Sequence, residues 1–283
     1  MCFVVTAVIA LSSLALLSSL LLALVSRAFW VSHDSKVERI ETALPGNDCG
    51  ACGLPGCSEL ARMIAEGKAD VDACPVSGDA IVREVALITG KAYRGARARS
   101  VAIVLCNGGD QVTARRFHYN GVKDCTSAAI LFGGDKACRY ACMGLGTCAG
   151  VCPFDAIRML PSGLPEIDPL KCTACNKCVV ACPKRVIKLV PVERRLHILC
   201  SSHDTGPKVR EICRVGCIAC AKCVREAPER SITMEDNLAV VDYAFAIPDS
   251  VATVCPMETI HVLELDRSGE RNGAGAAAGG GIL

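Results

Sequence analysis

Residues 172–183 read CTACNKCVVACP, with four Cys at the spacing C-x₂-C-x₂-C-x₃-C and a Pro directly after the last one. This spacing is typical of proteins that hold two 4Fe–4S clusters, in which the first three thiolates bind one cluster and the fourth binds the other. The stretch therefore predicts two iron–sulfur clusters that share their ligands between two Cys runs.

A second, longer Cys run precedes it. Residues 138–153 read CRYACMGLGTCAGVCP, which we interpret as a stretched version of the same motif. The run at 172–183 matches the bacterial ferredoxin pattern without deviation, and in that fold the fourth ligand of each run crosses over to the other cluster. The predicted ligand sets are Cys138, Cys142, Cys148 and Cys182 for one cluster, and Cys152, Cys172, Cys175 and Cys178 for the other.

The segment around each crossing position is repeated four times. The copies are CPFDAI from residue 152, CPKRVI from 182, APERSI from 227 and CPMETI from 255. Each copy precedes a short segment of alternating apolar residues, which is typical of a strand. Because a repeated unit indicates a repeated architecture, the sequence predicts two ferredoxin-like domains in tandem, residues 96–196 and 197–266.

The second of these domains has lost part of its ligands. Its run, CIACAKCVREAP, ends on Ala227 where a Cys is expected, and Phe245, Pro248 and Val251 stand where three more Cys belong. All four losses affect the same cluster, so we expect that cluster to be absent as a whole. The remaining cluster keeps a full predicted set, which is Cys217, Cys220, Cys223 and Cys255.

A rival assignment stays open for this domain. Cys213 could join Cys217, Cys220 and Cys223 in one local site that suits zinc or a strained cluster, which would leave Cys255 unused. Five Cys lie outside the predicted sets, and Cys106 and Cys125 among them are interpreted as buried, inert thiols. The five are Cys2, Cys106, Cys125, Cys200 and Cys213.

A separate Cys group lies nearer the N-terminus. Residues 49–57 read CGACGLPGC, and a fourth Cys followed by Pro comes later. Its glycines allow a short loop to wrap a bulky group, and Ser58 to Lys68 reads as a helix that opens on a capping Ser. We predict a 4Fe–4S module, with a zinc knuckle as the alternative. The predicted ligands are Cys49, Cys52, Cys57 and Cys74.

The N-terminus predicts a membrane anchor. Phe3 to Val25 contains no charged residue and, as a helix of about 35 Å, is long enough to cross a bilayer. A cleaved signal peptide is the alternative, but no Lys or Arg precedes the apolar stretch. Arg27, Lys36 and Arg39 follow it, which places the rest of the chain in the cytoplasm.

Composition agrees with a metal-rich cytoplasmic protein. The 283 residues include 21 Cys, and in a reducing compartment such a number favours metal thiolates over disulfides. The net charge of +2 gives no indication of a nucleic-acid partner. Aromatic residues make up 4% of the chain, so its small cores depend on clusters for stability.

Together, the anchor, the CGxCGxPGC module and the C-terminal Cys array resemble the B subunits of Rnf ion-translocating electron-transport complexes, in their longer form. The resemblance implies an α+β chain with a single transmembrane helix (1–30), a small mainly helical module (31–95), and two bacterial-ferredoxin-like domains before a disordered tail (267–283). It implies four 4Fe–4S clusters on the sixteen predicted ligands.

The resemblance also implies a function. The chain would be a single-pass protein of the inner membrane that takes electrons from reduced ferredoxin on the cytoplasmic side. It would relay them to other subunits of a translocase coupled to Na⁺ or H⁺ transport, with no catalytic acid, base or nucleophile of its own. Lys184, Arg185 and Lys188 are a candidate docking patch for an acidic ferredoxin.

Two other functions remain open from the sequence. One is a cluster-carrying subunit of another respiratory hydrogenase or reductase. The other is a membrane-tethered redox sensor or zinc-binding interaction module, although a sensor needs an output domain and the chain shows none. The anchor implies contact with membrane lipid in every case.

Overall fold

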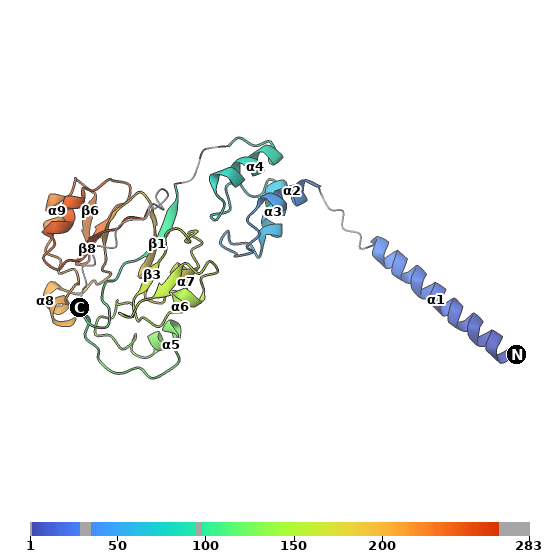
Figure 1. The fold of residues 1–283 in the computed structure, drawn as a ribbon, viewed down its shortest axis with the longest axis horizontal. Helices are drawn as coiled ribbons and strands as arrows, with labels where there is room; N and C mark the ends of the chain where they lie inside the picture. Colours follow the sequence, from blue (N-terminus) through green and yellow to red (C-terminus); the bar gives the residue numbers. More distant parts are fainter. Residues whose placement is uncertain (1, 29–34, 94, 96–97, 266–283) are drawn as a thin grey trace, which may run out of the picture.

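The computed structural model describes residues 2–28, 35–93, 95 and 98–265 (Figure 1). It begins with a long helix, α1 (Cys2–Ala28), which stands apart from the rest of the chain. Val5–Arg27 within α1 reaches a mean hydropathy of 2.5 and has no buried residue in its most apolar window, so by length and composition it could cross a membrane. The predicted tail at 267–283 lies outside the described residues.

Three helices form the small domain that follows: α2 (Ser35–Ala43), α3 (Cys57–Ala65) and α4 (Asp79–Thr89). Their apolar faces meet in a core that includes Ile40, Leu60, Ile64 and Val85, each at most 1% exposed. The helix predicted over Ser58 to Lys68 corresponds to α3, which starts one residue earlier, at Cys57, and ends at Ala65. Its first N–H is capped by Asp48 and not by the expected Ser, since the Asp48 carboxylate accepts from Cys57 N–H at 2.6 Å.

Two units of mixed structure make up the remainder, and each is closed by pairing of its first and last strands. In the first unit (residues 100–191), β1 pairs antiparallel with β4, with Val101 opposite Val190. In the second unit (residues 196–262), β5 pairs antiparallel with β8. A hairpin lies inside each unit, β2 with β3 and β6 with β7.

The bounds of these elements are short, as expected for chains organised around Cys loops. In the first unit they are β1 (Ser100–Val104), α5 (Cys125–Ile130), α6 (Thr147–Gly150), β2 (Ile157–Met159), β3 (Pro165–Ile167), α7 (Lys177–Ala181) and β4 (Ile187–Pro191). In the second unit they are β5 (Leu196–Ile198), α8 (Gly206–Ile212), α9 (Lys222–Glu226), β6 (Ile232–Glu235), β7 (Leu238–Val241), η1 (Asp249–Val254) and β8 (Ile260–Val262).

The fourfold sequence repeat has a matching backbone. The fourth residue of each copy takes a left-handed conformation that non-Gly residues seldom adopt. These residues are Asp155, Arg185, Arg230 and Glu258, with φ of 47°, 53°, 67° and 50°. Each stands two positions before the first residue of a strand. The same turn is therefore built four times, even where the copy begins with Ala227.

Apolar packing occupies the part of the second unit that lacks Cys. Val251 is completely buried and belongs to a core with Ile232, Ile260 and Cys223. Ala227 packs against the same core. Apolar packing thus stabilises this part of the unit, where the Cys ligands of a cluster are absent from the sequence.

Candidate iron–sulfur sites

One pocket in the first unit brings together the ligands predicted from two different runs. It is lined by the thiols of Cys152, Cys172, Cys175 and Cys178 and encloses about 330 Å³ of empty space. Cys152 precedes β2, whereas Cys172 and Cys175 lie on the loop that enters α7 and Cys178 lies in its first turn. Cys172 accepts a hydrogen bond from Ala102 N–H on β1, and Cys152 accepts one from Ala156 N–H, both at 3.4 Å.

A pocket in the second unit is built in the same way. Its lining includes Cys217, Cys220, Cys223 and Cys255, and it encloses about 370 Å³. Cys255 reaches it from the far end of the unit and accepts from Thr259 N–H at 3.4 Å. The rival set would place Cys213 here, but Cys213 lines another pocket.

The third pocket differs from the sequence-based set by one residue. It encloses about 360 Å³ and is lined by Cys125, Cys142, Cys148 and Cys182. Cys138, which the sequence places in this set, lines a different pocket together with Cys106, Cys200 and Cys213. Cys125, interpreted from the sequence as an inert thiol, lines this pocket, whereas Cys138 does not.

The reason is the register of the first Cys run. Residues 142–153 read CMGLGTCAGVCP and align without a gap with the runs at 172–183 and 217–228. The third and fifth positions of all three runs are left-handed. They are Gly144 and Gly146 (φ 77° and 80°), Ala174 and Asn176 (56° and 66°), and Ala219 and Ala221 (56° and 54°). The run therefore starts at Cys142, and Leu145 occupies the position of its second Cys.

Cys125 lies outside the run but lines the same pocket. It begins α5, where the Asp124 side chain accepts from Ser127 N–H at 2.7 Å and caps the helix. Thr147 links this helix start to the Cys loop, because its hydroxyl donates to Asp124 at 2.8 Å and accepts from Cys125 N–H at 2.7 Å. Leu145 packs against the cluster of buried side chains that contains Cys125. The C-x₂-L-x₂-C spacing of residues 142–148 was the available sequence signal.

In each of the three pockets, four thiols belong to the lining. Within the described part of the chain, no group of three His, Cys, Asp or Glu side chains is arranged to hold a single metal ion. Burial raises the pKa of Cys142 and Cys178 to about 12 and of Cys148 and Cys223 to about 11. Such thiols are protonated at neutral pH, so ligation by them releases protons. Four thiols with backbone N–H donors to sulfur form a donor set that fits a 4Fe–4S cluster.

The helical domain holds the N-terminal Cys group. Cys74 is buried in its core, and Cys52 and Cys57 are partly buried against that core. Gly50 and Gly53 have φ of 68° and 84°, conformations in which a side chain would be strained, so the loop requires glycine at both positions. Cys49 lies at the start of this loop and is partly exposed.

The candidate docking patch is smaller than its sequence suggests. The Lys184 ammonium donates to the backbone carbonyl of Arg139, and burial lowers its pKa. Arg185 is exposed just before β4 and Lys188 is exposed on it, whereas Lys184 is half-buried. Arg185 and Lys188 are therefore the better exposed cations of this patch.

Comparison with known proteins agrees with this architecture. A family model described as a putative Fe-S cluster matches residues 44–76, and one described as a 4Fe-4S binding domain matches residues 164–187. The B subunit of the ion-translocating oxidoreductase complex of Methanosarcina acetivorans is 32% identical over 91% of this chain and 98% of its own length. The chain belongs to the family of B subunits of ion-translocating oxidoreductase complexes.

Two further relatives of this family carry names that specify a reaction. The B subunit of the Na⁺-translocating ferredoxin:NAD⁺ oxidoreductase complex of Acetobacterium woodii is 47% identical over 78% of this chain, a match that spans 66% of that protein. The B subunit of the proton-translocating ferredoxin:NAD⁺ oxidoreductase complex of Clostridium ljungdahlii is 37% identical over 92% of this chain and 93% of its own length. The two names differ in the coupled ion.

Proposed function

We propose that this chain is the membrane-anchored electron-transfer subunit of an ion-translocating oxidoreductase complex. It would accept electrons from reduced ferredoxin and pass them to other subunits, with Na⁺ or H⁺ as the coupled ion. The single observation that carries the proposal is the grouping of twelve Cys around three pockets, each with thiols from at least two chain segments. Membership of the family supports the same function.

Four cluster sites follow from this proposal. Three correspond to the pockets, and the fourth to the helical module, whose four Cys match a putative Fe-S cluster family. The paired first and last strands and the internal hairpin of each unit support a tandem of two ferredoxin-like domains. The proposed ligands are Cys49, Cys52, Cys57 and Cys74; Cys152, Cys172, Cys175 and Cys178; Cys125, Cys142, Cys148 and Cys182; and Cys217, Cys220, Cys223 and Cys255.

The protein contributes ligands and environment, not acid–base catalysis. Clusters in such sites supply one-electron oxidation and reduction. The thiols of this chain would bind the clusters. The N–H groups of Ala102, Ala156 and Thr259 donate to the sulfurs of these proposed ligands. Hydrogen bonds to sulfur and the degree of burial are the means by which a protein adjusts a cluster potential. These residues therefore tune the relay without reacting themselves.

The apolar helix α1 would fix the chain to the inner membrane. Its single apolar span and the basic residues that follow it support a single-pass topology with the cytoplasm on the side of the cluster sites. Arg185 and Lys188 would then face an acidic ferredoxin, where opposite charge raises the rate of encounter. Membrane fractions should retain the protein through carbonate washing, and protease added to the cytoplasmic face should digest it.

The experiment that tests this function is done under anaerobic conditions and measures metal content and reduction by ferredoxin. The full chain is purified with its partner subunits, assayed for iron, sulfide and zinc, and then mixed with reduced ferredoxin while its visible absorbance is recorded. Bleaching of the absorbance with stoichiometric electron uptake is expected. Zinc in place of iron, or iron that ferredoxin does not reduce, would contradict the proposed function. A variant with Cys175→Ala and Cys178→Ala serves as the control for one site.

A further inference from the structure

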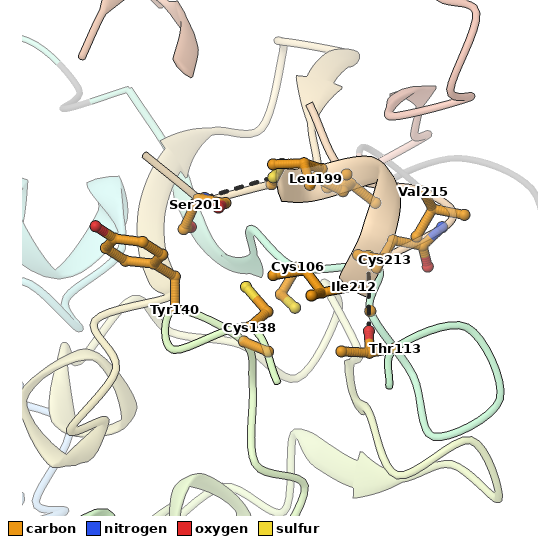
Figure 2. Close-up of a pocket in the computed structure, with 16 residues that line it drawn as sticks. Cys106, Thr113, Cys138, Tyr140, Leu199, Ser201, Ile212, Cys213 and Val215 are labelled. Atoms are coloured by element: carbon orange, nitrogen blue, oxygen red, sulfur yellow. Dashed lines mark hydrogen bonds between the residues drawn. The ribbon is translucent and has the colours of Figure 1, made fainter. Parts of the chain in front are cut away.

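Four Cys outside the sites above line one pocket of their own. Cys106, Cys138, Cys200 and Cys213 line a pocket of about 380 Å³, similar in volume to the other Cys pockets. Figure 2 labels Cys106, Cys138 and Cys213 in it. The remaining lining is apolar or weakly polar, and no acidic side chain belongs to it among the described residues. The sequence leaves these residues without a common role, because they lie on four separate segments.

The four Cys form two equivalent pairs, one from each unit. Cys106 lies two residues beyond the end of β1, and Cys200 lies two residues beyond the end of β5. Cys138 and Cys213 each stand four residues before the first Cys of a run, in CRYAC and CRVGC. Each unit thus supplies one thiol after its first strand and one before its first Cys run. A chance collection of inert thiols would not repeat in this way.

Backbone contacts hold the two pairs together across the boundary between the units. Asn107 N–H donates to Leu199 carbonyl oxygen at 3.1 Å, and the Ser201 hydroxyl donates to Leu105 carbonyl oxygen at 2.8 Å. On the other side, Thr113 forms a β-bridge with Cys213. The pocket therefore has walls from both units, each fixed by hydrogen bonds.

Polar groups in this pocket are directed at sulfur, as in the other sites. Cys106 accepts from Cys142 N–H at 3.4 Å, and Cys200 accepts from Cys217 N–H at 3.3 Å and from Ser202 N–H at 3.4 Å. The Thr113 hydroxyl donates to Cys213 at 3.6 Å. Donors aimed at thiol sulfur stabilise the anionic thiolate that a metal centre requires.

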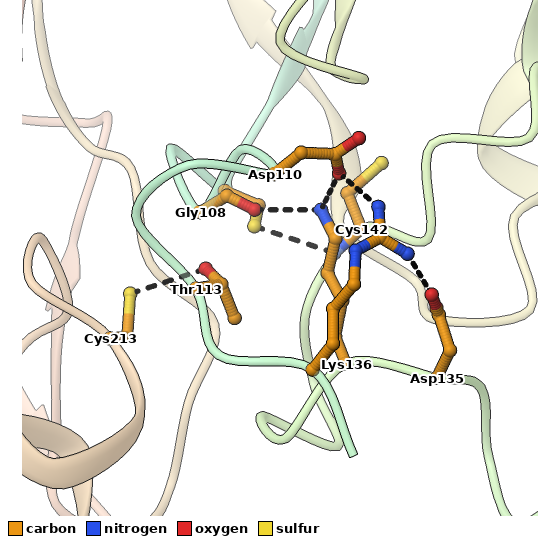
Figure 3. Close-up of polar contacts among 9 residues, drawn as sticks. Gly108, Asp110, Thr113, Asp135, Lys136, Cys142 and Cys213 are labelled. Atoms are coloured by element: carbon orange, nitrogen blue, oxygen red, sulfur yellow. Dashed lines mark hydrogen bonds and ion pairs between the residues drawn. The ribbon is translucent and has the colours of Figure 1, made fainter. Parts of the chain in front are cut away.

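A buried cation lies beside the pocket. The Lys136 side chain is 2% exposed, and its ammonium donates to Gly108 carbonyl oxygen at 2.8 Å and lies 3.3 Å from an Asp110 oxygen (Figure 3). Its positive charge lowers the pKa of Cys106, against the larger effect of burial. Burying a Lys is costly unless opposite charge lies nearby, and thiolates around a cluster would supply such charge in addition to Asp110.

We propose that Cys106, Cys138, Cys200 and Cys213 bind a fifth 4Fe–4S cluster that links the two units. The inference rests on the proposed function only in taking the chain to be an iron–sulfur protein. Like the other three sites, this one has four thiols around a pocket of similar volume, although here each thiol comes from a different segment. Donors directed at sulfur also occur at Cys152, Cys172 and Cys255. Every Cys of the chain except Cys2 then belongs to a cluster set.

The position gives the fifth cluster a structural and a relay role. Cys142, which donates to Cys106, lines a pocket of the first unit, and Cys217, which donates to Cys200, lines the pocket of the second. The proposed site thus lies between two other sites. One hydrogen bond connects it to each of them. Without it, the two units would have no redox centre at their boundary.

Iron and sulfide content of the full chain, purified anaerobically, tests the inference. Wild type should hold about twenty iron, and Cys106→Ala, Cys138→Ala, Cys200→Ala and Cys213→Ala should each lose about four. Cys2→Ala is the matched control and should lose none. Wild type with about sixteen iron, or iron unchanged in the Cys106 and Cys200 variants, overturns the fifth site while leaving the proposed function intact.

Double variants separate loss of one cluster from general misfolding. Cys138→Ala with Cys213→Ala should lose about four iron, no more than either single variant, since both remove the same cluster. Cys138→Ala with Cys182→Ala should lose about eight. A loss of only about four iron in the second double variant would show that Cys138 and Cys182 bind the same cluster, which contradicts the fifth site. About one zinc in wild type, lost in the single variants without loss of iron, would overturn the cluster in favour of a zinc site.

Discussion

The backbone N–H of Cys142 donates to the thiol of Cys106 at 3.4 Å, although the two residues line different Cys pockets. The contact forms the wall between the two sites. Lys136 lies close enough to lower the pKa of both thiols, although burial outweighs it in each case. One buried cation therefore acts on two neighbouring sites.

Replacement of this cation should change redox potentials. Lys136→Met removes a positive charge next to both sites, so the potentials of both clusters should fall by on the order of tens of millivolts, because the more negative, reduced state loses stabilisation. Redox titration followed by EPR measures the shift. Lys188→Met, at an exposed position on β4, is the control, and an equal shift there would assign the effect to surface charge.

If the fourth thiol of each run binds the cluster of the other run, single Cys variants of the two runs should lose different clusters. Cys152→Ala and Cys182→Ala should each remove about four iron from different clusters, and the double variant about eight. The physical reason is that Cys152 lines the pocket of the run at 172–183, and Cys182 lines the pocket of the run at 142–153. Mössbauer spectra identify the cluster lost. The same spectral component missing from both single variants would contradict the crossing.

The register of the first run predicts a rescue. Cys125→Ala should lose about four iron, because Cys125 replaces the missing second Cys of the run. Adding Leu145→Cys restores the C-x₂-C-x₂-C spacing, at a position packed beside Cys125, and should return the iron. Leu145→Cys in the wild-type background is the control and should add no iron. Failure of the rescue in a folded double variant would argue against this register.

The second unit should not regain its lost cluster from one thiol. Ala227→Cys should add no iron, because one ligand cannot hold a cluster and the completely buried Val251 packs in the same core. Cys255→Ala, in contrast, should remove about four iron from the pocket it shares with Cys223. Iron assays on the two variants check both statements. Retained iron in Cys255→Ala would favour the rival set with Cys213.

A buried histidine predicts a pH dependence of stability. His197 is fully buried on β5, and burial lowers its pKa to about 4 from an ordinary 6.5. Below pH 6.5 the unfolded chain protonates this imidazole while the folded chain does not, so stability is lost as pH falls toward 4. Between pH 7 and pH 5 the loss should be about 2 kcal/mol. Anaerobic urea unfolding of wild type and His197→Phe measures it, and identical pH profiles would refute the assignment.

Much of the architecture follows from local sequence pattern. The run at residues 172–183, the fourfold repeat and the loss at Ala227 depend on spacing within a few residues, and spacing sets backbone geometry directly. The glycine-rich loop at 49–57 and the apolar stretch within α1 are local in the same sense. For these features the structure places the elements close to where the pattern predicts them.

The sequence by itself determined that this chain carries Cys loops at ferredoxin spacing, because three thiols on one loop are brought together by the loop alone. Tertiary structure decided which distant thiol lines each pocket. Cys125 and Cys138 are thirteen residues apart, yet they line different pockets. Cys106, Cys200 and Cys213 meet Cys138 only because β1 and β5 place two segments side by side at the boundary between the units. Spacing along the chain carries no information on such meetings, since they depend on strand pairing and packing over about a hundred residues.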